Sequence, residues 1–213
     1  MASLRPEMQY ATLDQQTETA QLGMWVFLAT EVLFFGALIF GYYIYRISYP
    51  DEFVSAGRDA KFLLGSINVA ILVTSSLTMV GALECVKRDM IPRAVAALLA
   101  TAGLGFAFLG VKGYEYVQDY HDHTVPLLSF VLKPDQHAPA ELFWAFYYVA
   151  TGIHAVHLSI GIGAVLFYAW RTRSGRYSSL YYSPIEVLGL YWSFVDTVWL
   201  FLFAAIYPLG RAG

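Results

Sequence analysis

Charged residues and cysteines are scarce in this sequence. Asp, Glu, Lys and Arg make up 14% of the 213 residues, whereas a soluble domain usually has about 25%. The lone Cys85 cannot form an internal disulfide or a thiolate metal cluster. The net charge of −3 predicts no nucleic-acid partner. The chain also has neither a glycine-rich phosphate loop nor a nucleophile elbow, so phosphate-binding and hydrolytic chemistries have no support.

Long apolar runs are present instead. Hydrophobic residues make up 58% of the sequence, and they concentrate in five blocks that each reach the about 20 residues needed to cross a bilayer. Because backbone groups in lipid must be hydrogen-bonded within the segment, each block is expected to be a helix. We therefore predict an all-α polytopic membrane protein, a bundle of five transmembrane helices forming one domain over 1–213. The predicted helices span about 22–45, 62–83, 94–116, 142–170 and 185–207, of which the fourth is the longest.

The distribution of Lys and Arg predicts the orientation of the chain. Cytoplasmic loops of membrane proteins carry an excess of these cations. The two short loops after the second and fourth predicted helices are dense in them, with Lys87, Arg88, Arg93, Arg171, Arg173 and Arg176. We therefore expect a cytoplasmic N-terminus and an external C-terminus. Lys112, toward the end of the third predicted helix, is counted among the cations of the outer side.

Glu31 lies in the middle of the apolar stretch WVFLATEVLFFG in the first predicted helix. Polar residues at membrane depth are rare, face the bundle interior and pair with other groups. One interpretation makes Glu31 a carboxylate that handles protons or regulates a nearby proton path. The other makes it a hydrogen-bonded residue that locks the first helix against a neighbour. The sequence favours this packing interpretation, because no second acid in the same helix could form a relay.

His154 and His157 lie three residues apart on one face of the fourth predicted helix. Imidazole is a common metal ligand, but no other predicted helix contains a histidine that could complete a site across the bundle. Ala150 and Gly161 continue the same stripe with small residues, which let helices approach closely. We therefore predict structural histidines and no metal site on this chain.

Three further acids lie in the predicted helices. Glu115 belongs to the sequence KGYEY, close to the outer end of the third helix, while Glu186 and Asp196 belong to the fifth. The ten residues between Glu186 and Asp196 correspond to about 15 Å along a helix, too far for a direct carboxylate pair. Asp196 must find a hydrogen-bond donor such as a histidine, a tryptophan N–H or a backbone amide. We interpret the two acids of the fifth helix as polar anchors.

Five motifs follow one another along the chain, one in each predicted helix. They are TEVLFFGALIFGYY, INVAILVTSSLTM, FLGVKGYEY, YYVATGIHAVHLSIG and YWSFVDTVWLFLF. In this order and at these spacings, they resemble subunit III of the haem-copper oxidases, which are the cytochrome c and quinol oxidases. The resemblance covers nearly everything from Leu22 to Tyr207. The chain is similar to the five-helix members of that family rather than to the seven-helix members.

The resemblance also assigns family positions to individual residues. The buried polar positions of the family are matched, in order, by Glu31, Glu115, His154, His157, Glu186 and Asp196. Of these, Glu31 is the proton-related candidate. Ser193 stands where the family usually has a histidine. The group that bonds to this histidine in other members must therefore have a different partner in this chain.

The function implied by the resemblance is that of a subunit within an oxidase complex. Such a subunit has no redox centre of its own, stabilises the catalytic subunit I and supports proton uptake in aerobic respiration. Haem and copper would be held by partner subunits, and structural phospholipid would be bound by this chain. The implied partners are subunit I in direct contact, subunit II, other respiratory subunits and membrane lipids, in a bacterial inner membrane. Two alternatives stay open: an accessory subunit of a nitric oxide reductase, and an independent proton channel or transporter. A third, a haem-binding membrane anchor, is disfavoured by the number of histidines in the predicted helices.

Overall fold

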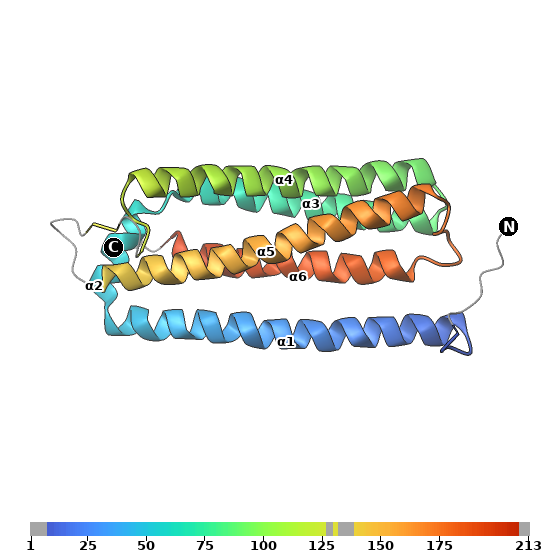
Figure 1. Ribbon diagram of the computed structural model, residues 1–213, viewed down its shortest axis with the longest axis horizontal. Coiled ribbons are helices and arrows are strands. Elements are labelled where there is room, and N and C mark those ends of the chain that lie inside the picture. The colour runs from blue at the N-terminus through green and yellow to red at the C-terminus, as the bar shows by residue number, and fades with distance from the viewer. Residues whose placement is uncertain (1–7, 127–129, 132–138, 209–213) are drawn as a thin grey trace.

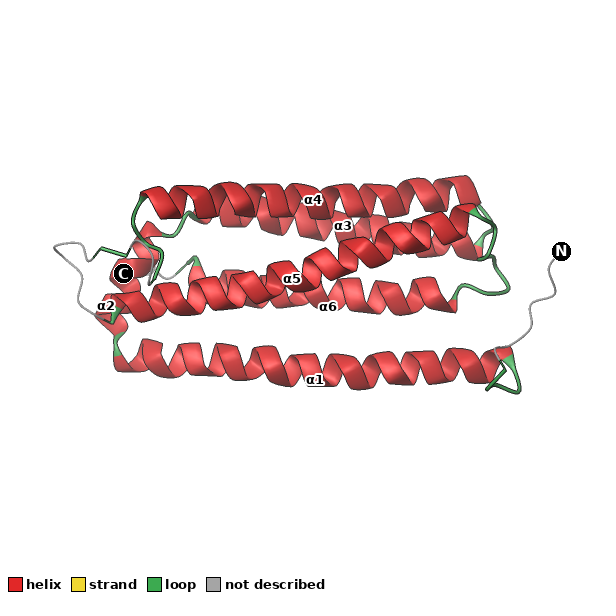
Figure 2. Ribbon diagram, in the orientation of Figure 1, coloured by secondary structure: helices red, strands yellow, loops and turns green. Residues whose placement is uncertain are grey.

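The computed structural model describes residues 8–126, 130–131 and 139–208. Within them the chain forms five long helices and one short helix (Figure 1). The helices are α1 (Leu13–Ser48), α2 (Pro50–Asp59), α3 (Phe62–Lys87), α4 (Ile91–His121), α5 (Ala140–Arg173) and α6 (Ser183–Ile206). All except α2 are long and apolar enough to cross a membrane. The predicted all-α bundle of five transmembrane helices is therefore confirmed, and Figure 2 shows it as helices joined by loops.

The first helix is longer than its apolar block. α1 begins at Leu13 because Thr12 caps it, its hydroxyl accepting a hydrogen bond from the Gln15 N–H at 3.1 Å. Asp14 in the first turn adds a negative charge where the helix dipole favours one. With 36 residues, α1 rather than the predicted fourth helix is the longest. Polar capping residues, which hydropathy does not register, account for the difference.

The short helix α2 was not predicted, because ten residues with a polar surface do not resemble a membrane span. Pro50 occupies its first turn, where a missing N–H costs no hydrogen bond, and Asp51 and Glu52 follow. On the opposite face Phe53 is fully buried and packs edge-on against Phe143 of α5, with ring centroids 5.8 Å apart. α2 therefore covers one end of the bundle.

α6 lies inside the bundle and α1 lies at its edge (Figure 1). α3 and α4 form an antiparallel hairpin, α5 crosses the bundle obliquely, and α6 packs against α1, α3 and α5. In the apolar stretch of α6, 44% of the residues are buried, against 11% in α1. α1 buries only Leu28, Phe35 and Tyr42, at intervals of seven residues. It therefore contacts the other helices through one narrow stripe.

The two loops at the end of the bundle where α1 begins are bonded to each other. Asp89, between α3 and α4, accepts hydrogen bonds from the Ser179 hydroxyl at 2.6 Å and from the Ser179 N–H at 2.8 Å. These hydrogen bonds hold the pKa of the Asp89 carboxyl below its ordinary value. Asp89 has a φ of 56°, in the left-handed region that Asp enters more readily than most residues. The α3–α4 loop is thereby joined to the α5–α6 loop.

Candidate functional site

Glu31 on α1 contacts His157 on α5. Glu31 Oε2 lies 3.1 Å from His157 Nε2. Both side chains are largely enclosed, with 17% of the glutamate and 18% of the histidine exposed. Phe35, one turn further along α1, packs edge-on against the imidazole with ring centroids 5.3 Å apart. Glu31 is therefore directed at the neighbouring helix, where α1 meets α5.

The other nitrogen of His157 determines how many protons this pair holds. His157 Nδ1 lies 2.9 Å from the backbone carbonyl of Ile153, and a carbonyl oxygen only accepts hydrogen bonds. Nδ1 therefore carries a hydrogen. The contact between Nε2 and the Glu31 carboxyl then needs one more proton, carried either by the imidazole or by the carboxyl. The geometry makes Glu31 and His157 a pair that shares one proton.

His154 has a different environment from His157. Its ring is 1% exposed and packs against Phe108 of α4 and Trp199 of α6, with centroid distances of 5.5 and 5.2 Å. Neither ring nitrogen has a hydrogen-bond partner among the described residues. The two histidines thus serve different helix contacts. In the part of the chain that the structure describes, no three His, Cys, Asp or Glu side chains gather as they would around a metal ion.

Asp196 links α6 to α3. It is 7% exposed and accepts a hydrogen bond from the Ser76 hydroxyl of α3. The donor is thus a hydroxyl, and not the imidazole, indole or amide that was expected. One turn earlier on α6, Trp192 Nε1 donates to the Ser75 hydroxyl at 3.0 Å. Ser193, at the position where the family usually has a histidine, is exposed on α6.

Glu186, in the first turn of α6, contacts two other helices. Gln21 of α1 donates from Nε2 to Glu186 Oε2 at 2.9 Å. Lys87 Nζ at the end of α3 lies 3.6 Å from Glu186 Oε1. The Glu186 side chain is 28% exposed, so it joins α1, α3 and α6 at the bundle end where α1 begins.

A charged cluster lies at the opposite end, where α1 ends. We call it the Lys112 cluster, and its members are Lys112, Glu115 and Asp119 of α4, Tyr147 of α5, and Tyr207 directly after α6. Each is at most 2% exposed. Lys112 Nζ donates to Glu115 Oε2 at 3.0 Å, to the Tyr147 hydroxyl at 2.9 Å and to the Tyr207 hydroxyl at 2.8 Å. Lys112, which was counted among the cations of the outer side, is therefore enclosed by partners within the bundle, while the side of the membrane on which it lies stays a prediction.

The two tyrosines also contact the acids of the cluster. Tyr207 donates from its hydroxyl to Glu115 Oε1 at 2.8 Å. The Tyr147 hydroxyl lies 3.0 Å from the same Glu115 oxygen and 3.1 Å from Asp119 Oδ2. The cluster therefore joins α4, α5 and the end of α6 through charged and hydroxyl groups.

Lys61, the residue before α3, connects the Lys112 cluster with the surface. Its Nζ lies 3.2 Å from Asp119 Oδ1 and 3.0 Å from Asp122 Oδ2, and the Asp122 side chain is 57% exposed. Partial burial lowers the pKa of Lys61, but the hydrogen bond to Asp122 and the charge of Asp119 outweigh it, so the pKa lies above its ordinary value. Lys61 is therefore a charged link between buried and exposed carboxylates.

Sequence reasoning found Glu115 but missed the rest of the Lys112 cluster. Lys112, Glu115 and Asp119 follow at spacings of three and four residues, which places them on one helix face. This signal is incomplete in the sequence because the predicted helix ends before Asp119, whereas α4 includes it. Tyr147 and Tyr207 come from other parts of the chain, and no local pattern connects them to Lys112.

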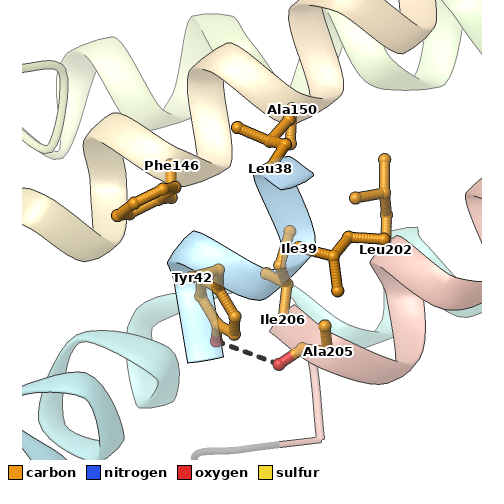
Figure 3. A pocket seen from close by; sticks show the side chains of 8 residues that line it. All are labelled: Leu38, Ile39, Tyr42, Phe146, Ala150, Leu202, Ala205 and Ile206. Atoms are coloured by element: carbon orange, nitrogen blue, oxygen red, sulfur yellow. Dashed lines mark hydrogen bonds between the residues drawn. The ribbon is translucent and has the colours of Figure 1, made fainter. Parts of the chain in front are cut away.

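An apolar pocket lies where α1 meets α5 and α6 (Figure 3). It is lined by Leu38, Ile39, Tyr42, Phe146, Ala150, Leu202, Ala205 and Ile206. The Tyr42 hydroxyl donates to the backbone carbonyl of Ala205 at 2.9 Å. Since this hydroxyl is already bonded, the lining offers mainly hydrocarbon surface. Such a lining suits an apolar group rather than a charged substrate.

Known proteins resemble the chain over nearly its whole length. Residues 10–211 match the family described as cytochrome c oxidase subunit III. A cytochrome c oxidase subunit 3 from Thermostichus vulcanus is 31% identical over 191 residues, which cover 89% of this chain and 87% of the relative. A quinol oxidase subunit 3 from Bacillus subtilis is 26% identical over 211 residues, which cover 95% of each chain.

A third relative is a longer protein. The haem-copper oxidase subunit I+III of Aeropyrum pernix is 30% identical over 190 residues, which cover 86% of this chain but 22% of the relative. The similarity is thus confined to one part of that protein. Taken together with the five membrane-length helices, these matches show that the chain belongs to the cytochrome c oxidase subunit III family.

Proposed function

We propose that the chain is the non-redox subunit III of a haem-copper terminal oxidase, stabilises its catalytic subunit and supports proton uptake. Membership of the subunit III family supports the place in the oxidase. In this proposal haem and copper belong to partner subunits. This chain contributes helix surfaces, bound phospholipid and side chains that can take up protons.

Direct packing against subunit I is supported by the relative whose name joins subunits I and III. Fusion places two partners in one membrane at a fixed ratio, which is useful when they form one structure. We also propose subunit II as a member of the complex. Lys and Arg gather in and directly beside the α3–α4 and α5–α6 loops, and this density supports a cytoplasmic N-terminus. We also propose a bacterial inner membrane as the location.

The contact between Glu31 and His157 carries the proposal for proton uptake. It links the peripheral α1 to α5, and it shares one proton between a carboxyl and an imidazole. Imidazole and carboxyl groups can each carry a hydrogen or accept a hydrogen bond, depending on their protonation. The pair can therefore hold a proton that is passed on toward subunit I.

Replacing Glu31 by Gln in the assembled oxidase tests this role. The amide has nearly the same size and can donate a hydrogen bond to His157 Nε2, but it cannot bind a proton. We expect normal assembly, fewer protons released per electron in vesicles, and inactivation after fewer turnovers. Oxygen consumption, proton release and the haem spectrum measure these three properties.

Glu186→Gln is the matched control. Glu186 also bonds α1 to another helix, but its partners are Gln21 and Lys87 rather than an imidazole. This variant is expected to pump protons and resist inactivation like the unaltered oxidase. If Glu31→Gln does so as well, Glu31 serves packing alone and the proton role is wrong.

A further inference from the structure

The Lys112 cluster contains more hydrogen-bond acceptors than donors. Lys112 uses all three of its N–H groups, on Glu115 and on the two tyrosines. Tyr207 gives its one hydroxyl hydrogen to Glu115 Oε1. Glu115 thus has a donor at each oxygen, whereas Asp119 Oδ2 has the Tyr147 hydroxyl as its contact. Whether both carboxyl groups receive enough hydrogen bonds therefore depends on Tyr147.

Tyr147 has one hydroxyl hydrogen and two carboxyl neighbours. Its oxygen lies 3.0 Å from Glu115 Oε1 and 3.1 Å from Asp119 Oδ2, and both distances are those of hydrogen bonds. If both carboxyl groups were ionised, one of these contacts would bring two lone pairs together with no hydrogen between them. Such an arrangement is unfavourable for buried groups.

A single proton on Asp119 Oδ2 satisfies every contact. Asp119 then donates to the Tyr147 oxygen, and Tyr147 donates to Glu115 Oε1. The Tyr147 oxygen accepts from Lys112 and from Asp119 and donates once, which is its full capacity. Glu115, which then receives bonds from Lys112, Tyr147 and Tyr207, is the better place for the negative charge.

The balance of charge gives the same answer. In the buried part of the site, the two carboxyl groups of Glu115 and Asp119 face the one ammonium group of Lys112. With both carboxyl groups ionised, one negative charge is left over there. An unbalanced charge is costly where the dielectric constant is low. Lys61 does not remove this excess, because it is shared with Asp122.

Among the residues that the structure describes, the other titratable groups around the cluster supply no alternative donor. They are Tyr116 of α4, and Tyr148 and His154 of α5. The Tyr116 hydroxyl bonds to the Thr151 hydroxyl at 2.6 Å. Neither His154 nitrogen has a hydrogen-bond partner among the residues that the structure describes. The missing hydrogen is thus best supplied by a proton on a carboxyl group of the cluster.

We propose that the Lys112 cluster is a proton-binding site in which Asp119 holds a proton at neutral pH and Tyr147 links it to an ionised Glu115. Lys61 and Asp122 connect the site to water at the bundle end where α1 ends. It differs from the Glu31–His157 pair, since His157 is ten residues from Tyr147, about 15 Å along α5. The proposal concerns these side chains themselves and goes beyond the place of the chain in an oxidase.

Infrared spectroscopy of the purified complex tests the proposal directly. A protonated carboxyl group has a C=O band that an ionised carboxylate lacks, and the band shifts in heavy water. At neutral pH we expect one such band in the spectrum of the unaltered complex that is missing from the spectrum of Asp119→Asn. Asp89→Asn, the same change at an exposed carboxyl group of the opposite bundle end, is the matched control and leaves the band in place.

Stability provides a second measurement. Asn at position 119 is neutral and can donate an N–H to Tyr147, as the protonated Asp119 does. We therefore expect Asp119→Asn to assemble and to keep the thermal midpoint at neutral pH, whereas Glu115→Gln lowers it. The proposal is overturned if the unaltered complex has no such band or if Asp119→Asn retains it. Failure of Asp119→Asn to assemble also overturns it, because the fold would then require an ionised Asp119.

Discussion

Lys112 is the buried cation that three other side chains of its cluster contact. It is 2% exposed, and its partners are Glu115 and two tyrosine hydroxyls. Lys112→Met keeps the apolar stem but leaves the charge of Glu115 uncompensated. Breaking a buried ion pair in this way costs about 3–5 kcal/mol. We expect a loss of that size in the free energy of unfolding of the full chain in detergent, measured by denaturant titration.

Lys87→Met shows how a weaker pair of the same chemistry behaves. Lys87 is 35% exposed and lies 3.6 Å from Glu186, and exposed ion pairs contribute about 0–1 kcal/mol. The two substitutions remove the same group from the same type of residue. If both substitutions lower the free energy of unfolding equally, burial does not determine how much Lys112 contributes to stability.

At the scale of the helices, Gly65 lets α3 approach the end of α6. A Cβ atom at position 65 would lie 2.8 Å from Cε1 of the Tyr207 ring. The ring cannot move freely, because its hydroxyl is bonded to Glu115 and Lys112. We expect Gly65→Ala to lower the free energy of unfolding by about 1–3 kcal/mol, as overpacking does in other interiors.

Gly81→Ala on the same helix is the matched comparison. A Cβ atom at position 81 meets nothing within 4 Å, so the change is expected to stabilise α3 by about 0.5–1 kcal/mol through the higher helix propensity of Ala. Unfolding experiments on both variants measure the difference. If Gly65→Ala is as stable as Gly81→Ala, close contact with Tyr207 does not constrain α3.

The helices also show which features the sequence could predict. Length and hydropathy predicted the five membrane spans, because lipid imposes both properties on any helix that crosses it. They could not predict α2, whose one buried face is built around Phe53. Glu31 and His157 were both singled out, yet their pairing was not predicted. They are 126 residues apart, and periodicity within a helix carries no information about which neighbour it faces.

At the scale of the whole molecule, polar contacts are placed at both ends and in the middle of the bundle. Helices in lipid gain little from the hydrophobic effect on one another, so packing and hydrogen bonds determine their arrangement. The Lys112 cluster joins helices at one end of the bundle. Glu31 and His157 join α1 to α5 in the middle, and Asp89 and Ser179 join two loops at the other end. Each contact joins segments that are distant in the sequence, and so helps to fix their relative positions.

The contact between Asp89 and Ser179 predicts a response to acid at one end of the molecule. The folded chain holds the Asp89 pKa below the value of about 3.9 expected for an unfolded chain. Because the pKa is lowered by folding, the stabilisation from the ionised Asp89 is fully present above the unfolded pKa. It is lost as the pH falls through the folded pKa. We expect the Ser179 amide to exchange its hydrogen faster, relative to its intrinsic rate, once the pH falls below about 4. Asp89→Asn tolerates the same left-handed φ of 56° but cannot titrate, so its exchange should lack this acid step. An identical step in both chains would show that another group releases the loop.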